Sequence, residues 1–258
     1  MLGKTLDALR AALEILKMKQ ADPAAAHALR TITKQMLTSS PSLPRPERGA
    51  LIAQARREWF EGATAGAPAQ PHIEPWITRS WQRCLGAGRH PQQSVSFDAV
   101  SRARAREVAE RNLQLAAAAR PVIERLSRTL ADTRYFPILT DAQGVVVDVG
   151  ALPRLGERDE QRALDLARVG VDLSEAGVGT TAIGAGLGEQ EPVWLHRGEH
   201  FFDATGIYSC AGAPLFSPQG SCVGMLDLTG VNEQERPELK HLATASARAI
   251  ENALVLQH

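Results

Sequence analysis

YSCAGAPLFSPQGSCVGMLDLTG, residues Tyr208–Gly230, is the stretch that decides the fold of this chain. Its centre, Ser217–Gly220, has proline at the second and glycine at the fourth position of a type I turn. Small and apolar residues flank the turn, and Asp227 is the one acid among them. We predict two antiparallel strands with one packed face and one face free to line a pocket. No catalytic motif accompanies them, which favours a small-molecule sensing domain over an enzyme.

The register of this hairpin separates its residues into two faces. A tight turn would pair Cys210 with Asp227 and Gly212 with Met225. One face is then small and apolar, suited to packing against a helix: Ala211, Ala213, Leu215, Cys222, Leu226 and Leu228. The other mixes aromatic, sulfur and polar groups, as a ligand pocket does: Tyr208, Cys210, Phe216, Val223, Met225, Asp227 and Thr229. The alternative for that face is a second core layer in which Asp227 caps a loop.

Composition narrows the class of protein. Lys+Arg and Asp+Glu are both 29, so no whole-chain basic field is present to hold DNA or RNA, and we expect no direct nucleic acid binding. No apolar run reaches the roughly 18 residues of a membrane span, and the charged residues 1–20 do not resemble a signal peptide. Three cysteines are too few and too scattered for a disulfide framework. We therefore expect a cytoplasmic protein without a membrane contact.

The chain divides into three predicted parts. Residues 1–66 form an N-terminal all-helical extension, in which residues 4–20 carry a leucine stripe and a later helix covers about Pro46–Glu61. Residues 67–97 contain a linker and one short helix with two tryptophans. Residues 98–258 form the sensor domain.

Within the sensor domain, strands and helices do not alternate regularly, so an α+β fold with an antiparallel sheet and flanking helices is expected. Residues 98–132 are helical, and Pro121 should kink or divide that helix. A hairpin turns at Asp141–Gly144, and a short helix and a short strand follow. The last helix, about Pro237–Leu256, has a heptad-like seam: Leu239, Leu242, Ser246, Ala249, Ala253 and Leu256.

Four motifs then identify a family resemblance: PWITRSWQRCLGAG, DLSEAGVGTTAIG, VWLHRGEHFF and the hairpin itself. Over roughly residues 46–258 the chain resembles the N-terminal sensory region of bacterial sigma-54-dependent activators of the acetoin catabolism regulator type. The resemblance implies a GAF fold, signal input and a homodimer. It does not carry over ATP hydrolysis or DNA binding, because no G-x-x-x-x-G-K-[ST] loop is present. We expect either a fragment of such an activator or a separate sensor acting through another transcription regulator.

Seven residues make up the predicted ligand site. Four lie in the hairpin, namely Tyr208, Cys210, Met225 and Asp227, and the other three are Trp194, Phe201 and Thr180. Thr180 or Thr181 is expected to cap a short helix beside the pocket, where free N–H groups could hold an anion. Trp194 and Phe201 are aromatic residues close to the pocket in a chain that has few.

Several alternatives stay open. His196 and His200 are four apart, but a strand precedes Gly198, so we expect no metal site, and no motif indicates a cofactor. A redox enzyme resembling free methionine sulfoxide reductase would use the cysteines, although Cys210 and Cys222 are expected on the order of 17 Å apart along the strands. A third alternative is a ligand-free co-regulator that binds a partner through residues 1–40. The short helix with two tryptophans (the tryptophan helix) either forms a contact surface or, as we favour, packs onto the sensor domain.

Overall fold

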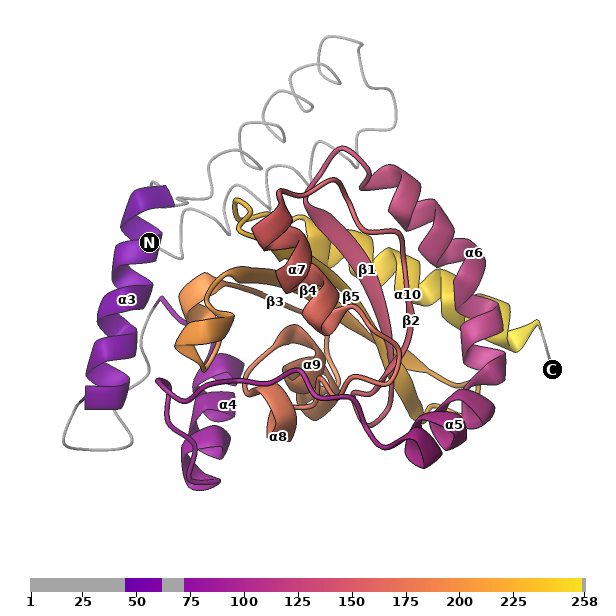
Figure 1. Ribbon diagram of the computed structural model, residues 1–258, viewed down its shortest axis with the longest axis horizontal. Coiled ribbons are helices and arrows are strands. Elements are labelled where there is room, and N and C mark those ends of the chain that lie inside the picture. Colours follow the sequence, from indigo (N-terminus) through magenta and orange to yellow (C-terminus); the bar gives the residue numbers. More distant parts are fainter. Residues whose placement is uncertain (1–44, 62–71, 257–258) are drawn as a thin grey trace, which may run out of the picture. The chain divides into compact units, whose positions relative to one another are not determined.

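The computed structural model describes residues 45–61 and 72–256 (Figure 1). The chain divides into two units, residues 1–48 and 49–258, and the elements described below belong to the second apart from residues 45–48. The helices predicted before residue 45 and the linker at residues 62–71 lie outside the described residues. The domain boundaries at residues 66 and 97 therefore stay predictions.

Eight α-helices and five strands are described. The helices are α3 (Arg45–Glu61), α4 (Pro75–Gly86), α5 (Arg102–Arg111), α6 (Leu113–Thr129), α7 (Glu157–Leu166), α8 (Glu175–Val178), α9 (Ala182–Glu189) and α10 (Leu239–Val255). The strands are β1 (Tyr135–Asp141), β2 (Val146–Val149), β3 (Val193–His196), β4 (Tyr208–Phe216) and β5 (Cys222–Val231). Two 3-10 turns, η1 (Arg197–Glu199) and η2 (Asp203–Thr205), connect β3 to β4.

The five strands form one antiparallel sheet in the order β2-β1-β5-β4-β3. The predicted α+β class is confirmed. β5 lies at the centre, between β1 and β4, and is buried along most of its length. Every side chain on β5 therefore points into one of the two layers of helices and loops that cover the sheet.

The β4–β5 hairpin has a longer connection than predicted. Gly212 pairs with Asp227 and Cys210 with Thr229, so the predicted pairing was wrong by two residues. The turn does form, since Gly220 N–H donates to the Ser217 carbonyl at 2.9 Å, but the ladder is irregular between Leu215 and Phe216. Before the irregularity, a shift by two residues leaves the side chains on their predicted faces, because strand side chains alternate with a period of two. Val223, next to the irregularity, was predicted on the pocket face but packs against the cluster of α6 and α10.

Helices α6 and α10 cover one face of the sheet (Figure 1). The apolar hairpin face packs there as predicted, through Ala211, Ala213, Leu215, Leu226 and Leu228. The face of α10 that packs on the sheet is not the predicted seam, except at Leu239 and Ser246, and the seam stays a prediction. The residues that it buries are Leu239, Ala243, Ser246, Ala247, Ile250 and Leu254, which follow the helical period toward the sheet. Leu242, Ala249 and Ala253 are half-buried, and Leu256 is 87% exposed.

The opposite face of the sheet is covered by α7, α8 and α9, and α4 packs in turn on α8 and α9 (Figure 1). Trp81 of α4 is fully buried in a cluster with Trp59, Phe201 and Phe202. The indole N–H of Trp81 donates to the carbonyl of Glu199 at 3.0 Å. The predicted docking of the tryptophan helix onto the sensor is confirmed.

The helical segment before β1 divides at Asn112 and not at Pro121. Asn112 closes α5 by donating its side-chain amide to the carbonyl of Val108 at 2.8 Å. α6 then runs through Pro121, which is exposed. Buried residues on both sides of the proline, such as Ala118 and Ile123, hold the helix against the sheet and offset the hydrogen bond that proline cannot make.

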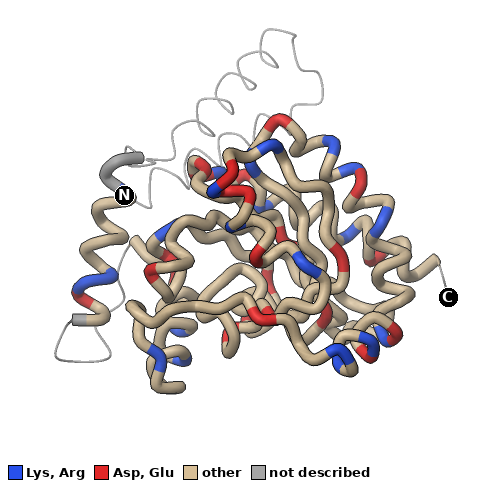
Figure 2. The backbone as a smooth tube through the Cα atoms, viewed as in Figure 1, with Lys and Arg blue, Asp and Glu red and all other residues tan. Residues whose placement is uncertain are grey.

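Charges are mixed over the described chain, and Figure 2 shows basic and acidic residues interspersed along the backbone. On α5, for example, Arg104 and Arg111 both pair with Glu107. Within the described ranges, no helix is both long and apolar enough to cross a bilayer.

Candidate functional site

A small cavity lies between strands β4 and β5 and the helices α8 and α9. Its volume is about 30 Å³. A single water requires roughly 10–15 Å³ on this measure, so the cavity has room for about two waters. The walls are mostly apolar, with Leu166, Val178 and Ile183 among them, and the polar side chains that reach it are Thr181, His200, Thr205, Tyr208, Cys210, Asp227 and Thr229.

Asp227 is the exceptional residue of this cavity. The side chain is fully buried. Its Oδ2 accepts a hydrogen bond from the hydroxyl of Thr229, whereas Oδ1 has no hydrogen-bond partner among the described residues. Burial raises the pKa of this carboxyl to about 7. A buried oxygen without a partner is costly, and a ligand that donates a hydrogen bond would remove that cost.

His200 contributes a second polar atom. It is buried, and its Nδ1 donates to the carbonyl of Arg197 at 2.9 Å, so Nε2 is the unprotonated nitrogen. Burial lowers the pKa of His200 to about 4, which keeps the ring neutral at pH 7. Nε2 lies 3.7 Å from the Sγ of Cys210, whose own pKa burial raises well above its usual range.

Three of the four predicted hairpin residues reach this cavity. Tyr208, Cys210 and Asp227 line it directly. Met225 lies in the same apolar cluster, and its Sδ and Cε fill the space that the Cβ atoms of Gly186 and Gly212 would otherwise occupy. Small residues in α9 and β4 thus allow the helix to approach the sheet closely.

The other three predicted residues lie elsewhere. Trp194 pairs with Ala211 across the ladder, so it shares the face that packs against α6 and α10. Phe201 belongs to the aromatic cluster around α4. The hydroxyl of Thr180 lies 2.7 Å from that of Ser80 on α4, outside the cavity. The neighbouring Thr181 is the helix cap, since it accepts from the N–H of Gly184 at 3.1 Å.

Sequence reasoning considered His200 only as a metal ligand, and it expected the short helix after Thr181 beside the pocket without recognising how closely α9 packs. The small residues Ala182, Gly184 and Gly186 were the available signal for α9. A Cβ on Gly186 would lie 2.3 Å from Cε of Met225, and a Cβ on Gly184 would lie 2.7 Å from the backbone of Glu175. Because a side chain at these positions would clash, the glycines allow α9 to pack closely against its neighbours.

The thiols and histidines have structural partners. Cys84, Cys210 and Cys222 are free, and burial raises the pKa of each, that of Cys84 to about 11. Thiolate chemistry at neutral pH is therefore disfavoured. His196 Nδ1 contacts the hydroxyl of Ser209, and His200 contacts Cys210. Over residues 45–61 and 72–256, no cluster of three His, Cys, Asp or Glu residues could hold a metal ion.

Two wider grooves lie along α6, with volumes of about 270 and 430 Å³. Ser127 and Ala151 line both of them, and exposed arginines such as Arg128 and Arg154 lie at their edges. Neither groove contains a fully buried carboxyl group. The Asp227 cavity is smaller, but it contains a fully buried carboxyl group with one unpartnered oxygen.

Comparison with known proteins places this chain in a family. The family described as "MimR, N-terminal domain" matches residues 50–252. The acetoin catabolism regulatory protein of Cupriavidus necator is 34% identical over 189 residues, which are 70% of this chain and 27% of that protein. The propane 2-monooxygenase operon transcriptional activator MimR of Mycolicibacterium goodii is 32% identical over 213 residues, which are 81% of this chain and 34% of that protein. The chain thus spans about a quarter to a third of the length of these relatives.

Among solved structures, the E. coli DhaR(N)–DhaL complex contains a similar fold. The TM-score is 0.65 at 18% identity, covering 71% of this chain and 61% of that chain. This likeness confirms the α+β architecture alone. The predicted resemblance to the sensory regions of acetoin-type activators is confirmed by the family match and the relatives together, and the chain belongs to the MimR N-terminal domain family.

Proposed function

We propose that this chain is the signal-input module of a bacterial transcription regulator, and that its Asp227 cavity binds a small uncharged metabolite with a hydroxyl group. The observation that carries the proposal is the unpartnered Oδ1 of Asp227 in an otherwise apolar cavity. The ligand hydroxyl would donate to this oxygen, and its carbon skeleton would contact walls such as Val178 and Ile183.

The size of the cavity limits the ligand. Sites for drug-sized molecules are usually about 300–1,000 Å³, and this cavity is about 30 Å³. On this proposal the structure represents a closed form, and a ligand of a few carbon atoms would need the cavity wall to move. The names of relatives concern acetoin catabolism and a propane 2-monooxygenase operon, so compounds of three or four carbons are the class to test first.

A thermal-shift titration with acetoin, a four-carbon hydroxyketone, tests the proposal. A ligand that binds only the folded state raises the melting temperature. We expect acetoin to stabilise the wild type and not Asp227→Asn, which keeps the shape of the side chain but places an amide in the cavity. Asp165→Asn on α7 is the matched control, because it removes a carboxylate outside the cavity. Equal shifts in all three proteins would contradict the proposed site.

The small volume also favours a second function, in which the module acts without a ligand through contact with another protein. One similar fold is known from a complex of DhaR(N) with DhaL. Binding of a partner regulator that is unaffected by Asp227→Asn, together with no response to small hydroxyl compounds, would support this alternative. The redox alternative is less favoured, since burial raises the pKa of all three cysteine thiols and so disfavours the thiolate form.

For assembly and location we propose a cytoplasmic homodimer. α10 leaves apolar side chains uncovered at its end, with Val255 54% and Leu256 87% exposed. A second copy of α10 could cover them. Analytical ultracentrifugation of the purified chain tests this, and a single monomeric species at all concentrations would contradict it.

A further inference from the structure

The wall of the Asp227 cavity that lies opposite the sheet is a short segment, residues 174–189, which contains α8 and α9. Its inner side faces the cavity through Val178, Thr181 and Ile183. Its outer side contacts α4. Because the cavity is too small for an organic ligand, this segment is the part whose displacement would enlarge it.

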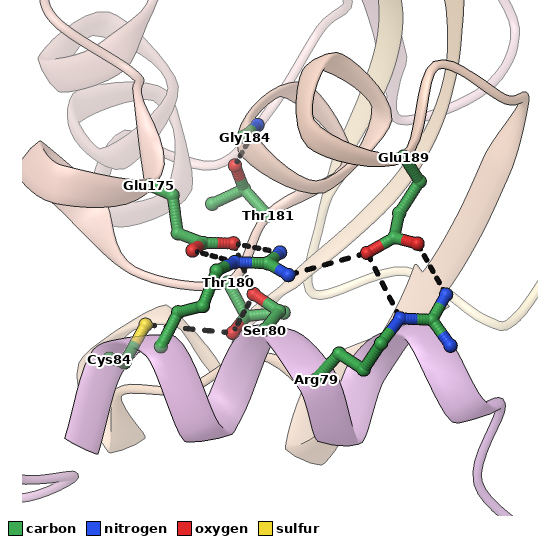
Figure 3. A network of polar contacts seen from close by, with 9 residues as sticks. Arg79, Ser80, Cys84, Glu175, Thr180, Thr181, Gly184 and Glu189 are labelled. Carbon is green, nitrogen blue, oxygen red and sulfur yellow. Dashed lines mark hydrogen bonds and ion pairs between the residues drawn. The ribbon is translucent and has the colours of Figure 1, made fainter. Parts of the chain in front are cut away.

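A polar network joins the outer side of the segment to α4 (Figure 3). Ser80 is fully buried, and its hydroxyl donates to Oε2 of Glu175 at 2.5 Å. The hydroxyl of Thr180, also fully buried, lies 2.7 Å from the same oxygen of Ser80. With its proton committed to Glu175, Ser80 accepts from Thr180. Separating these groups would leave two buried hydroxyls without partners, which is costly.

Arginines hold both ends of the segment. Arg83 binds Glu175 with two hydrogen bonds, from Nε at 2.7 Å and from Nη2 at 2.8 Å. Glu189, at the end of α9, pairs with Arg79 and with Arg83, and its pKa is lowered by the hydrogen bond from Arg79. Two-pronged guanidinium–carboxylate contacts depend on orientation, so they form only when the segment lies in this position.

The geometry points to a lid and a latch: residues 174–189 are the lid of the Asp227 cavity, and the network of Ser80 and Arg83 with Glu175, Thr180 and Glu189 is the latch that keeps it closed. The regulatory meaning of this device depends on the proposed function, because the latch would then set how readily effector enters. The opening itself requires no effector and is measurable without one.

Cys210 reports the opening. It is a buried thiol that lines the cavity under the lid. The rate of its reaction with N-ethylmaleimide, followed by peptide mass spectrometry, measures how often the lid exposes it. We expect Ser80→Ala and Arg83→Gln each to label Cys210 about fivefold or more faster than wild type, since each removes buried or two-pronged hydrogen bonds of the closed form. The rate at Cys222 should not change.

A general loss of stability must be separated from lid opening. Ile250→Val on α10 is the control, because Ile250 is fully buried on the opposite face of the sheet. Rates are compared at equal distances below each melting temperature. Faster labelling of Cys210 in the latch variants than in Ile250→Val supports the lid. Equal rates in all variants, or rates equal to wild type, overturn it. Since no effector is added, failure of acetoin to bind would contradict the proposed function and leave this result unchanged.

Discussion

The two faces of the sheet share strands but differ in content. Toward α6 and α10, the hairpin presents alanines and leucines that form a continuous apolar cluster. Toward α8 and α9, alternate residues of the same strands present Cys210, Asp227 and Thr229 around a cavity. The filled face provides packing energy, and the other contains buried polar groups that reduce stability. One short hairpin thus presents a packed face and a cavity face by side-chain alternation alone.

The largest loss of stability is expected from a substitution on the face that α6 and α10 cover. Leu228 is fully buried among residues of α6 and α10. Leu228→Ala leaves a void there, and we expect a loss of about 3 kcal/mol in the free energy of unfolding. Urea denaturation at pH 5 and pH 8 should give the same loss at both values, because no titratable group is involved. A loss that depends on pH would show that the two faces are not independent.

On the cavity face, the main effect depends on pH. Burial raises the pKa of Asp227 from 3.8 to about 7. The stability that this proton provides is fully present below pH 3.8 and is lost as pH rises through 7, since only the unfolded chain ionises freely. Asp227→Asn has no proton to lose. We expect its stability advantage over wild type to be roughly 2–3 kcal/mol larger at pH 8 than at pH 5.

The Asp227 prediction is checked by urea midpoints measured at both pH values. Asp165→Asn is again a suitable reference, because Asp165 does not line the cavity. An advantage for Asp227→Asn that is the same at pH 5 and pH 8 would mean that Asp227 is ionised in the folded protein throughout.

His200 should make the free energy of unfolding depend on pH in the opposite direction. Burial lowers its pKa from 6.5 to about 4, so its contribution is present above pH 6.5 and is lost as pH falls through 4. Between pH 6.5 and pH 5, we expect wild type to lose roughly 2 kcal/mol of stability that His200→Gln keeps. His241→Gln, an exposed change on α10, serves as the control. Parallel pH curves for wild type and His200→Gln would refute the neutral buried ring.

Close packing between α9 and the sheet has a smaller effect. A methyl group at Gly212 would lie 2.9 Å from Cε of Met225 and 3.3 Å from Oδ1 of Asp227. The flexible methionine can yield, so we expect Gly212→Ala to cost about 1 kcal/mol. Gly49→Ala, in open space on α3, should be neutral or slightly stabilising. Calorimetry compares the two, and equal melting temperatures would show that the cavity face is loosely packed.

The smallest stability effect is expected outside both faces. Leu256 is 87% exposed, so Leu256→Ser should change the free energy of unfolding of the isolated chain by less than about 0.5 kcal/mol. If α10 forms the proposed homodimer, the same change should weaken dimerisation in analytical ultracentrifugation. A dimer whose affinity is unchanged would place the interface elsewhere.

Much of the fold was predictable because it depends on local patterns. Turn residues at Asp141–Gly144 and Ser217–Gly220 gave both hairpins, and alternation gave the correct faces for Ala211 and Asp227. The pairing register was not predictable, because an irregularity at Leu215 lengthens the connection beyond a tight turn.

The candidate site was predictable where it lies on the hairpin and not where it depends on distant partners. Tyr208, Cys210 and Asp227 reach the cavity through strand alternation. Trp194 faces the other way because its orientation is set by pairing with β4. The hydroxyl of Thr180 is hydrogen-bonded to that of Ser80 on α4, 100 residues earlier in the chain. Contacts at such separation leave no periodic signal in the sequence.

The position of β5 beside β1 also has a consequence for the order of folding. The hairpins β1–β2 and β4–β5 join neighbouring segments, whereas Ile138 of β1 pairs with Asp227 of β5, roughly 90 residues later. Closing so long a loop is slow compared with forming a hairpin. The lid and the connector that carries His200 lie within that loop. We therefore expect the joining of the two hairpins to be a late event of refolding, which follows the formation of each hairpin.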